Sequence, residues 1–133
     1  MCIRDSHYDH IGGNQELKKR YGSVVVGFKG DSKRIPGIDI LLEDNQIWKA
    51  ENFEANIMHT PGHTSGHICF NFFKEKLVFT GDTLFSLGCG RIFEGTYEEM
   101  FESLNNLNTS IINESNLGVK NLFADLGIFL IEK

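Results

Sequence analysis

Three short stretches decide how this chain folds and what it can hold: His7-Tyr8-Asp9-His10, Pro61-Gly62-His63-Thr64-Ser65-Gly66-His67 and Thr80-Gly81-Asp82-Thr83. Each stretch lies next to a predicted strand and has glycine close by. Imidazole and carboxylate groups together form the ligand mixture of open, catalytic zinc or iron sites. Three such clusters in one chain of 133 residues predict a hydrolytic metal centre.

The bulk composition indicates a single domain without a nucleic-acid partner. With 41% hydrophobic residues, the chain can form one modest apolar core. The formal net charge of -5 argues against nucleic-acid binding, because phosphate recognition needs clustered lysine and arginine. We expect a monomer that acts on a small molecule.

Cysteine usage and hydropathy predict a cytoplasmic location. Cys2, Cys69 and Cys89 form no CxxC pair and no even framework, which is typical of free thiols in a reducing compartment. The first residues lack the basic start and apolar run of a signal peptide. The apolar stretch 126–131 is far shorter than the roughly 20 residues that span a bilayer. We therefore expect a soluble protein with no membrane partner.

Helix and strand signals alternate along the chain. Asn14 is a suitable N-cap, and Gly22 a suitable C-terminal stop, for a helix over 15–21. The expected strands are 23–27, then 39–42 with 46–50 as a hairpin, 56–59, and 67–73 with 76–80 as a second hairpin. Short paired strands with helices between them predict stacked sheets covered by helices.

A longer helix is predicted after the glycine-rich stretch 81–95. Thr96 and Glu99, three residues apart, form a capping box at its start. We expect this helix to end near residue 107, where the apolar periodicity decays into polar residues. Its predicted apolar stripe comprises Tyr97, Met100, Phe101, Leu104 and Leu107.

The ligand clusters are arranged for two cations in one pocket. An extended start lets the His7 imidazole face one metal, while a following turn directs Asp9 and His10 to a neighbouring position. His63 lies in a tight turn, and Asp82 follows a predicted strand end, where its carboxylate can bridge two ions about 3.5–4 Å apart. Such a pair activates water and polarises a carbonyl. A thiolate with a pKa of about 8.5 then departs without a general acid, which favours a thioester substrate.

The motifs resemble those of the metallo-β-lactamase superfamily, whose signature is His-x-His-x-Asp-His followed by a Gly-His turn and a Gly-Asp strand end. The stretch Gly88-Cys89-Gly90-Arg91-Ile92-Phe93-Glu94-Gly95-Thr96 is more specific, and it resembles glyoxalase II, the hydroxyacylglutathione hydrolase family. The resemblance covers residues 7–107.

The resemblance implies an α+β fold, a four-layer αββα sandwich that is incomplete at both ends. It implies two divalent metal ions, zinc in first place, with iron or manganese as alternatives. The first metal would be held by His7 and His63, the second by Asp9 and His10, with Asp82 bridging both. Asp9 and Asp82 would be the catalytic carboxylates.

The same resemblance implies the substrate. Arg91 and Phe93 match positions at which the family contacts glutathione: the arginine would pair with a carboxylate and the ring would pack on the peptide. The implied reaction is hydrolysis of S-D-lactoylglutathione to D-lactate and glutathione by a metal-bridging hydroxide.

The chain departs from the family pattern at both ends of the motif. Asp5 stands where the family has its first histidine, and no histidine follows His67. We therefore expect a partial catalytic domain over 7–107, a non-native leader over 1–6 and a divergent tail over 108–133. Each metal would lack one ligand, so we expect impaired stability and activity.

Two other functions remain open from the sequence. One is a mononuclear iron persulfide dioxygenase of the same superfamily, against which the sequence Phe93-Glu94-Gly95-Thr96 speaks. The other is a non-catalytic fragment with a vestigial metal site. His59 and His67 are interpreted as structural, with His67 in a hydrogen-bonding role behind the ligands.

Overall fold

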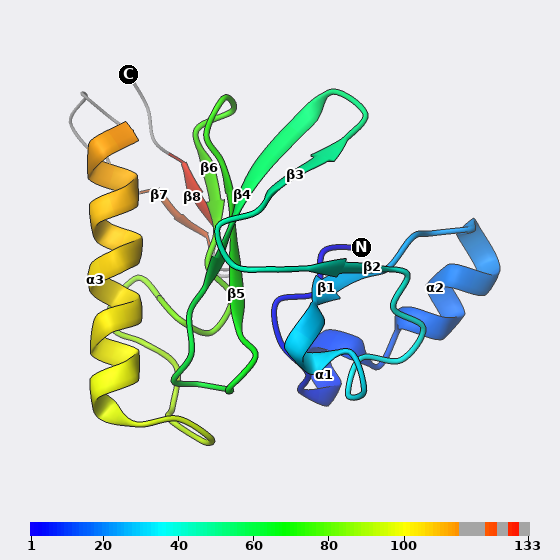
Figure 1. The fold of residues 1–133 in the computed structure, drawn as a ribbon, viewed down its shortest axis with the longest axis horizontal. Helices are drawn as coiled ribbons and strands as arrows, with labels where there is room; N and C mark the ends of the chain where they lie inside the picture. The colour runs from blue at the N-terminus through cyan, green and yellow to red at the C-terminus, as the bar shows by residue number, and fades with distance from the viewer. Residues whose placement is uncertain (115–121, 125–127, 131–133) are drawn as a thin grey trace.

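The computed structural model describes residues 1–114, 122–124 and 128–130 (Figure 1). Its helices are α1 (Tyr8–Ile11), α2 (Asn14–Tyr21), the single-turn 3₁₀ helix η1 (Lys29–Asp31) and α3 (Tyr97–Glu114). Its strands are β1 (Val26–Phe28), β2 (Ile40–Leu42), β3 (Ile47–Ala50), β4 (Phe53–His59), β5 (Ile68–Phe72), β6 (Leu77–Phe79), β7 (Leu122–Ala124) and β8 (Ile128–Leu130).

The strands form two sheets. β1 and β2 pair in parallel, and the larger sheet has the order β3-β4-β5-β6-β8-β7 with antiparallel neighbours. In Figure 1, α3 lies along one side of the larger sheet, while β1, β2, α1 and α2 lie on the other side. This layered arrangement of sheets and helices agrees with the predicted α+β class.

Both faces of the larger sheet are covered, because successive side chains of a strand point to opposite faces. On the side of β1 and β2, Ile57 and Phe70 pack with Val26 and Leu42 in one buried cluster. On the opposite face, a second buried cluster joins the sheet to α3 and comprises Met58, Cys69, Val78 and Leu107. The strands β4 and β5 therefore form the centre of the fold.

The predicted hairpin between 39–42 and 46–50 is wrong. β2 pairs with β1, whereas β3 pairs with β4. The backbone shows the reason: Asn45 N–H donates to the Ile57 carbonyl, and Ile57 N–H donates to the Gln46 carbonyl. The chain therefore crosses from the small sheet to the large one at the predicted hairpin tip. The second predicted hairpin is confirmed as β5 and β6.

The capping box of α3 is confirmed, since Thr96 N–H donates to Glu99 Oε2 at 2.7 Å and Glu99 N–H donates to Thr96 Oγ1 at 3.1 Å. The helix continues to Glu114, past the predicted end near residue 107. Its buried face is narrower than predicted, comprising Met100, Ser103 and Leu107, while Tyr97 and Phe101 are exposed. Phe101 lies about 100° round the helix from Met100, which turns it away from the sheet.

The N-terminal residues are part of the small sheet. Val26 N–H donates to the Met1 carbonyl, Ile3 N–H donates to the Val26 carbonyl, and Ile3 is buried beside Val25. The proposed divisions of the chain at residues 6 and 107 stay predictions, and half of the predicted tail over 108–133 lies outside the described residues.

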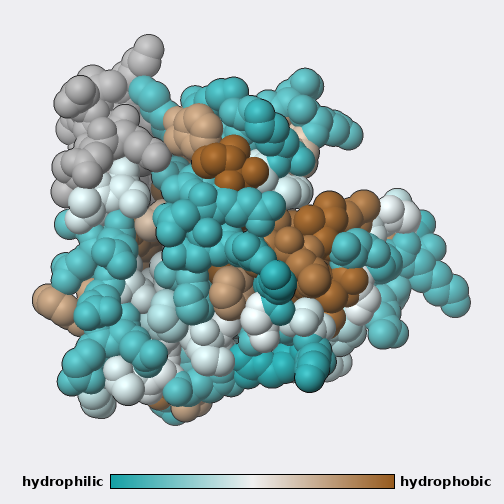
Figure 2. Space-filling view, in the orientation of Figure 1, coloured by the Kyte–Doolittle hydropathy of each residue, from teal (hydrophilic) through white to brown (hydrophobic). Residues whose placement is uncertain are grey.

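Figure 2 shows a broad apolar region over β1 and β2. The exposed apolar side chains there include Val24, Ile40 and Leu41. Within the described part of the chain, no helix has the length and hydropathy needed to cross a bilayer.

Candidate metal centre

The three predicted ligand clusters meet at one end of the sheets. His7 is the N-cap of α1, and Asp9 and His10 lie within this one-turn helix. His63 follows β4 in the turn that leads to β5, and Asp82 follows β6. His7, His63 and Asp82 therefore stand just outside regular elements, where the backbone can turn their side chains toward the common pocket, whereas Asp9 and His10 belong to the single turn of α1.

Four of the predicted ligands converge within hydrogen-bonding or near-contact distance. His7 Nδ1 lies 3.0 Å from His63 Nε2, and His63 Nε2 lies 3.2 Å from Asp82 Oδ2. The other carboxylate oxygen, Asp82 Oδ1, lies 3.6 Å from His10 Nε2. The two oxygens of Asp82 thus face two different imidazoles, an arrangement that suits a bridging ligand.

Asp9 differs from the other predicted ligands. Its Oδ2 lies 3.7 Å from His10 Nε2, but its side chain is 79% exposed. Asp9 therefore stands at the rim of the pocket, and its predicted role as a ligand stays a prediction.

Asp5 is a member of the centre that the sequence reasoning did not select. Its side chain is fully buried, and its Oδ2 lies 3.5 Å from His63 Nε2, 3.7 Å from His7 Nδ1 and 3.8 Å from His10 Nε2. This oxygen has no hydrogen-bond partner. The signal was present in the spacing, because position 5 is where the motif requires its first ligand.

The arrangement fits divalent cations. Two groups of residues, Asp5-His7-His63 and Asp5-His10-Asp82, each place one ligand atom per residue within 4.8 Å of the others. Imidazole nitrogen and carboxylate oxygen are donors that zinc, iron and manganese all accept. A buried carboxylate oxygen without a partner is costly unless a cation or donor satisfies it. These observations support a metal in the pocket without selecting among these ions.

Hydrogen bonds on the far side of His63 orient its ring. His63 Nδ1 lies 2.6 Å from the Arg91 carbonyl, which can only accept, so Nδ1 carries the proton. The lone pair of Nε2 is then directed into the pocket, as a metal ligand requires.

The His10 imidazole and the Asp82 carboxylate each stabilise the charged form of the other. The nearby Asp82 carboxylate raises the pKa of His10 despite the partial burial of the ring. The same contact lowers the pKa of Asp82, which keeps this carboxyl ionised.

His67 lies behind the ligands, as predicted. The Asp82 N–H donates to His67 Nε2 at 3.1 Å, and His67 Nδ1 lies 2.9 Å from the hydroxyl oxygens of Thr60 and Thr83. Because a backbone N–H can only donate, Nε2 is the acceptor and Nδ1 carries the proton. Burial lowers the pKa of His67 to about 3. The neutral ring therefore holds the backbone that carries Asp82.

The loop 88–96 covers the pocket from one side. Phe93 N–H donates to the His63 carbonyl, and the Phe93 ring lies 5.3 Å from the rings of both His7 and His63. The Arg91 guanidinium lies 5.7 Å from the centroid of the Phe93 ring. Gly90 permits this close approach, since a Cβ there would lie 2.0 Å from the Asp82 carbonyl oxygen. The predicted glutathione contacts of Arg91 and Phe93 remain predictions.

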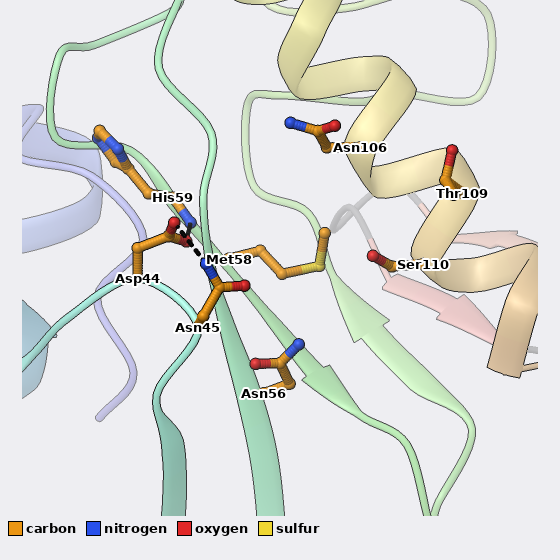
Figure 3. A pocket seen from close by; sticks show the side chains of 8 residues that line it. All are labelled: Asp44, Asn45, Asn56, Met58, His59, Asn106, Thr109 and Ser110. Carbon is orange, nitrogen blue, oxygen red and sulfur yellow. Dashed lines mark hydrogen bonds between the residues drawn. The ribbon is translucent and has the colours of Figure 1, made fainter.

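A separate polar cavity of about 330 Å³ lies between β4 and α3 (Figure 3). Asp44 and His59 stand at one end, where the His59 N–H donates to Asp44 Oδ1, and Asn106 and Ser110 of α3 stand at the other. None of the candidate metal ligands lines this cavity. His59 is otherwise structural, stacked on Phe28 with 4.4 Å between ring centroids.

Comparison with known proteins identifies the family. The sequence profile of the metallo-beta-lactamase superfamily matches residues 6–114. The chain belongs to this superfamily.

Solved structures with the metallo-β-lactamase fold share its architecture. ETHE1 from Myxococcus xanthus aligns with a TM-score of 0.70 and 25% sequence identity, and the alignment covers 82% of this chain and 47% of that chain. The B3 metallo-beta-lactamase BLEG-1 also aligns, with a TM-score of 0.70 and 25% identity over 79% of this chain and 60% of that one. The predicted fold class is confirmed.

Curated members of the superfamily narrow the resemblance to hydroxyacylglutathione hydrolases. The protein of that name from Pelagibacter ubique is 67% identical over 98 residues, which are 74% of this chain and 41% of the relative. That from Methylococcus capsulatus is 52% identical over 101 residues, 76% of this chain and 40% of the relative. The predicted resemblance is confirmed, and the chain spans about two fifths of the length of these relatives.

Proposed function

We propose that this chain carries the catalytic centre of a glyoxalase II-type thioester hydrolase, which cleaves S-D-lactoylglutathione to D-lactate and glutathione. The observation that carries the proposal is the convergence of His7, His10, His63 and Asp82 beneath the loop 88–96. The identity to proteins named hydroxyacylglutathione hydrolase supports the same activity.

We propose two divalent cations, zinc in first place, held by His7, His10, His63, Asp82 and the rim residue Asp9. Asp5 joins this set from its buried position. When bound, such ions act as Lewis acids toward the thioester carbonyl and make water a nucleophile at neutral pH. Asp82 and Asp9 are the proposed catalytic carboxylates. The hydrogen bond from the Asp82 N–H to His67 Nε2 and that from His63 Nδ1 to the Arg91 carbonyl hold the ligands in their working orientation.

The substrate side of the proposal rests on the loop 88–96. Among the described residues, no carboxylate forms an ion pair with Arg91, so its guanidinium is free for a carboxylate of glutathione. The Phe93 ring lies near both this cation and the His7 imidazole, where it can pack on the peptide. The leaving thiolate needs no protein acid, because its pKa of about 8.5 lies close to neutral pH.

We also propose a cellular location, an oligomeric state and an organisation of the chain for this activity. The three free cysteines and the net charge of -5 support a cytoplasmic monomer without a nucleic-acid partner. The proposed catalytic part spans residues 7–107, joined by Asp5 from the segment 1–6, and a divergent tail over 108–133 follows it. The names of the relatives favour the hydrolase over the persulfide dioxygenase.

The experiment is a thioester assay on the purified chain as zinc is added. We expect hydrolysis of S-D-lactoylglutathione to rise with zinc and to be absent in the His63→Ala variant, with no oxygen uptake on glutathione persulfide. Zinc-loaded chain that hydrolyses the thioester no faster than His63→Ala would contradict the proposal. Oxygen uptake in the iron-loaded chain would favour the dioxygenase instead.

A further inference from the structure

An ion pair outside the ligand set joins two segments that are far apart in the sequence. Arg34 Nη1 donates to Glu94 Oε1 at 2.5 Å, and Arg34 Nη2 donates to Glu94 Oε2 at 3.1 Å. On its other side, Arg34 Nε and Nη2 donate to Asp31 Oδ1 at 3.0 and 2.6 Å. The planar guanidinium is therefore fixed between two carboxylates, which a lysine could not reproduce.

The same Glu94 carboxylate is bonded to the turn that carries His63. Ser65 N–H and Ser65 Oγ donate to Glu94 Oε2 at 2.8 and 2.9 Å. The next residue, Gly66, packs directly on Asp31, because a Cβ there would lie 2.2 Å from Asp31 Cγ. Three segments thus meet at one junction: the connection around η1, the His63 turn and the loop 88–96.

Glu94 directly follows the part of the loop that contacts the metal centre. The Arg91 carbonyl accepts the His63 Nδ1 proton, Phe93 N–H donates to the His63 carbonyl, and Gly95 N–H donates to the Gly62 carbonyl. Any displacement of Glu94 would therefore loosen the contacts that select the His63 tautomer and place the Phe93 ring.

The ion pair also affects the charge available to a ligand. Glu94 lies three residues from Arg91 in the same loop, and Arg34 occupies its carboxylate. Without Arg34, Glu94 would keep only its hydrogen bonds from Ser65, and its charge would be left without a cationic partner in the loop that carries Arg91. It would then compete with any carboxylate ligand for this guanidinium.

We propose that Arg34 is a positioning residue, which holds Glu94 on the His63 turn, orders the loop 88–96 and keeps Arg91 free for a substrate carboxylate. The part concerning Arg91 rests on the proposed function, whereas the part concerning loop order does not.

Hydrogen exchange on the metal-free chain tests the ordering of the loop. We expect Arg34→Leu and Glu94→Gln each to speed exchange of the Phe93 and Gly95 amides roughly tenfold, by raising the population of the open loop. The matched control is Glu43→Gln, which removes the ion pair between Lys29 and Glu43, two exposed side chains. It should leave both amides unchanged. The core amide of Ile57 should be unaffected in all three variants. Unchanged exchange at Phe93 and Gly95 would overturn the ordering role.

A glutathione titration followed by NMR tests whether Arg34 keeps Arg91 free for a carboxylate. Comparing the Kd values of a single and a double variant separates this effect from a general loosening of the loop. We expect Arg34→Leu to raise the Kd for glutathione roughly tenfold, the range of one charge-assisted contact. The double variant Arg34→Leu/Glu94→Gln should bind better than Arg34→Leu alone, because the competing carboxylate is gone. Equal Kd values for the single and double variants would overturn the Arg91 part.

The two measurements separate this inference from the proposed function. If the wild-type chain neither binds glutathione nor hydrolyses the thioester, the proposed function and the Arg91 part both fail. The exchange experiment still decides the ordering role, because it needs neither metal nor substrate. The ¹⁵N shifts of His63 provide a further readout: Arg34→Leu should reduce the population protonated at Nδ1, and an unchanged tautomer would count against the ordering role.

Discussion

The two halves of the metal centre are supported very differently. His63 and Asp82 follow strands of the large sheet, and His67, Arg91 and the Ser65–Glu94 contacts hold their backbones and rings from behind. His7 and His10 lie on α1, a helix of one turn that has no buried residue and no side-chain cap. The sheet side is therefore preorganised by the protein, whereas the α1 side depends on what occupies the pocket. Asp5, buried between the halves with an unpartnered oxygen, connects them.

The largest expected effect comes from removing one ligand from each half. His63→Ala should weaken zinc binding by more than about 100-fold, because it removes the ligand that lies within reach of His7, Asp5 and Asp82. His7→Ala should weaken it less, since the His7 side chain is partly exposed and α1, a single turn without a buried residue, can shift to compensate. Competition with a chromophoric chelator measures both affinities. A greater loss in His7→Ala would reverse the comparison.

Replacing Asp5 with asparagine is expected to change the stability of the metal-free chain and the affinity for zinc in opposite directions. Asp5→Asn should stabilise the metal-free chain by about 1–3 kcal/mol, because a buried carboxylate oxygen without a donor is removed, yet it should weaken zinc binding. Asp5→His, which restores the family residue, should strengthen zinc binding and raise thioesterase activity. Urea denaturation without metal and zinc titration measure the two quantities separately. If Asp5→Asn destabilised the metal-free chain and left zinc affinity unchanged, Asp5 would be structural.

His67 should matter for both stability and metal affinity. His67→Phe fills a similar volume but leaves the Asp82 N–H and the Thr60 and Thr83 hydroxyls without their ring partners. We expect a loss of roughly 1–3 kcal/mol in the free energy of unfolding and about 10–100-fold weaker zinc binding. Thr109→Val is the control, because Thr109 is exposed on α3 and lines the separate polar cavity rather than the metal centre. Full zinc affinity in a folded His67→Phe variant would remove its positioning role.

The smallest expected effect is the pH dependence of the Arg34–Glu94 pair. The ion pair with Arg34 lowers the pKa of Glu94 to about 2, against about 4.3 for an unfolded glutamate. A lowered pKa stabilises the fold above pH 4.3, and this contribution disappears as the pH falls toward 2. Thermal unfolding of wild type and Glu94→Gln should therefore differ at pH 7 and converge near pH 2. A constant difference in Tm across that range would contradict the shift.

Many residues of the candidate metal centre could be predicted because they lie in short, contiguous sequence motifs. His63, His67 and Asp82 lie in short turns whose residues are contiguous in the sequence, and the second hairpin and the capping box are equally local. The convergence of these turns followed from their positions at strand ends. The resemblance to a family supplied the expectation of a shared pocket.

Long-range pairings were not predictable from one sequence. The sequences of 39–42 and 46–50 do not reveal which strands lie beside them. Their closeness in the chain favours a hairpin, whereas in the fold they belong to different sheets. The residue type of Asp5 breaks the motif, and only the fold shows its oxygen among three imidazoles. The Arg34–Glu94 pair spans 60 residues and has no periodic signal.

Zinc stoichiometry tests the central claim most directly. Equilibrium dialysis of the purified chain against increasing zinc, with metal counted by mass spectrometry, should approach two zinc ions per chain, with tighter binding in Asp5→His and the loss of both sites in Asp82→Ala. A wild-type chain that binds no more zinc than Asp82→Ala would show that these side chains lie together without forming a metal centre.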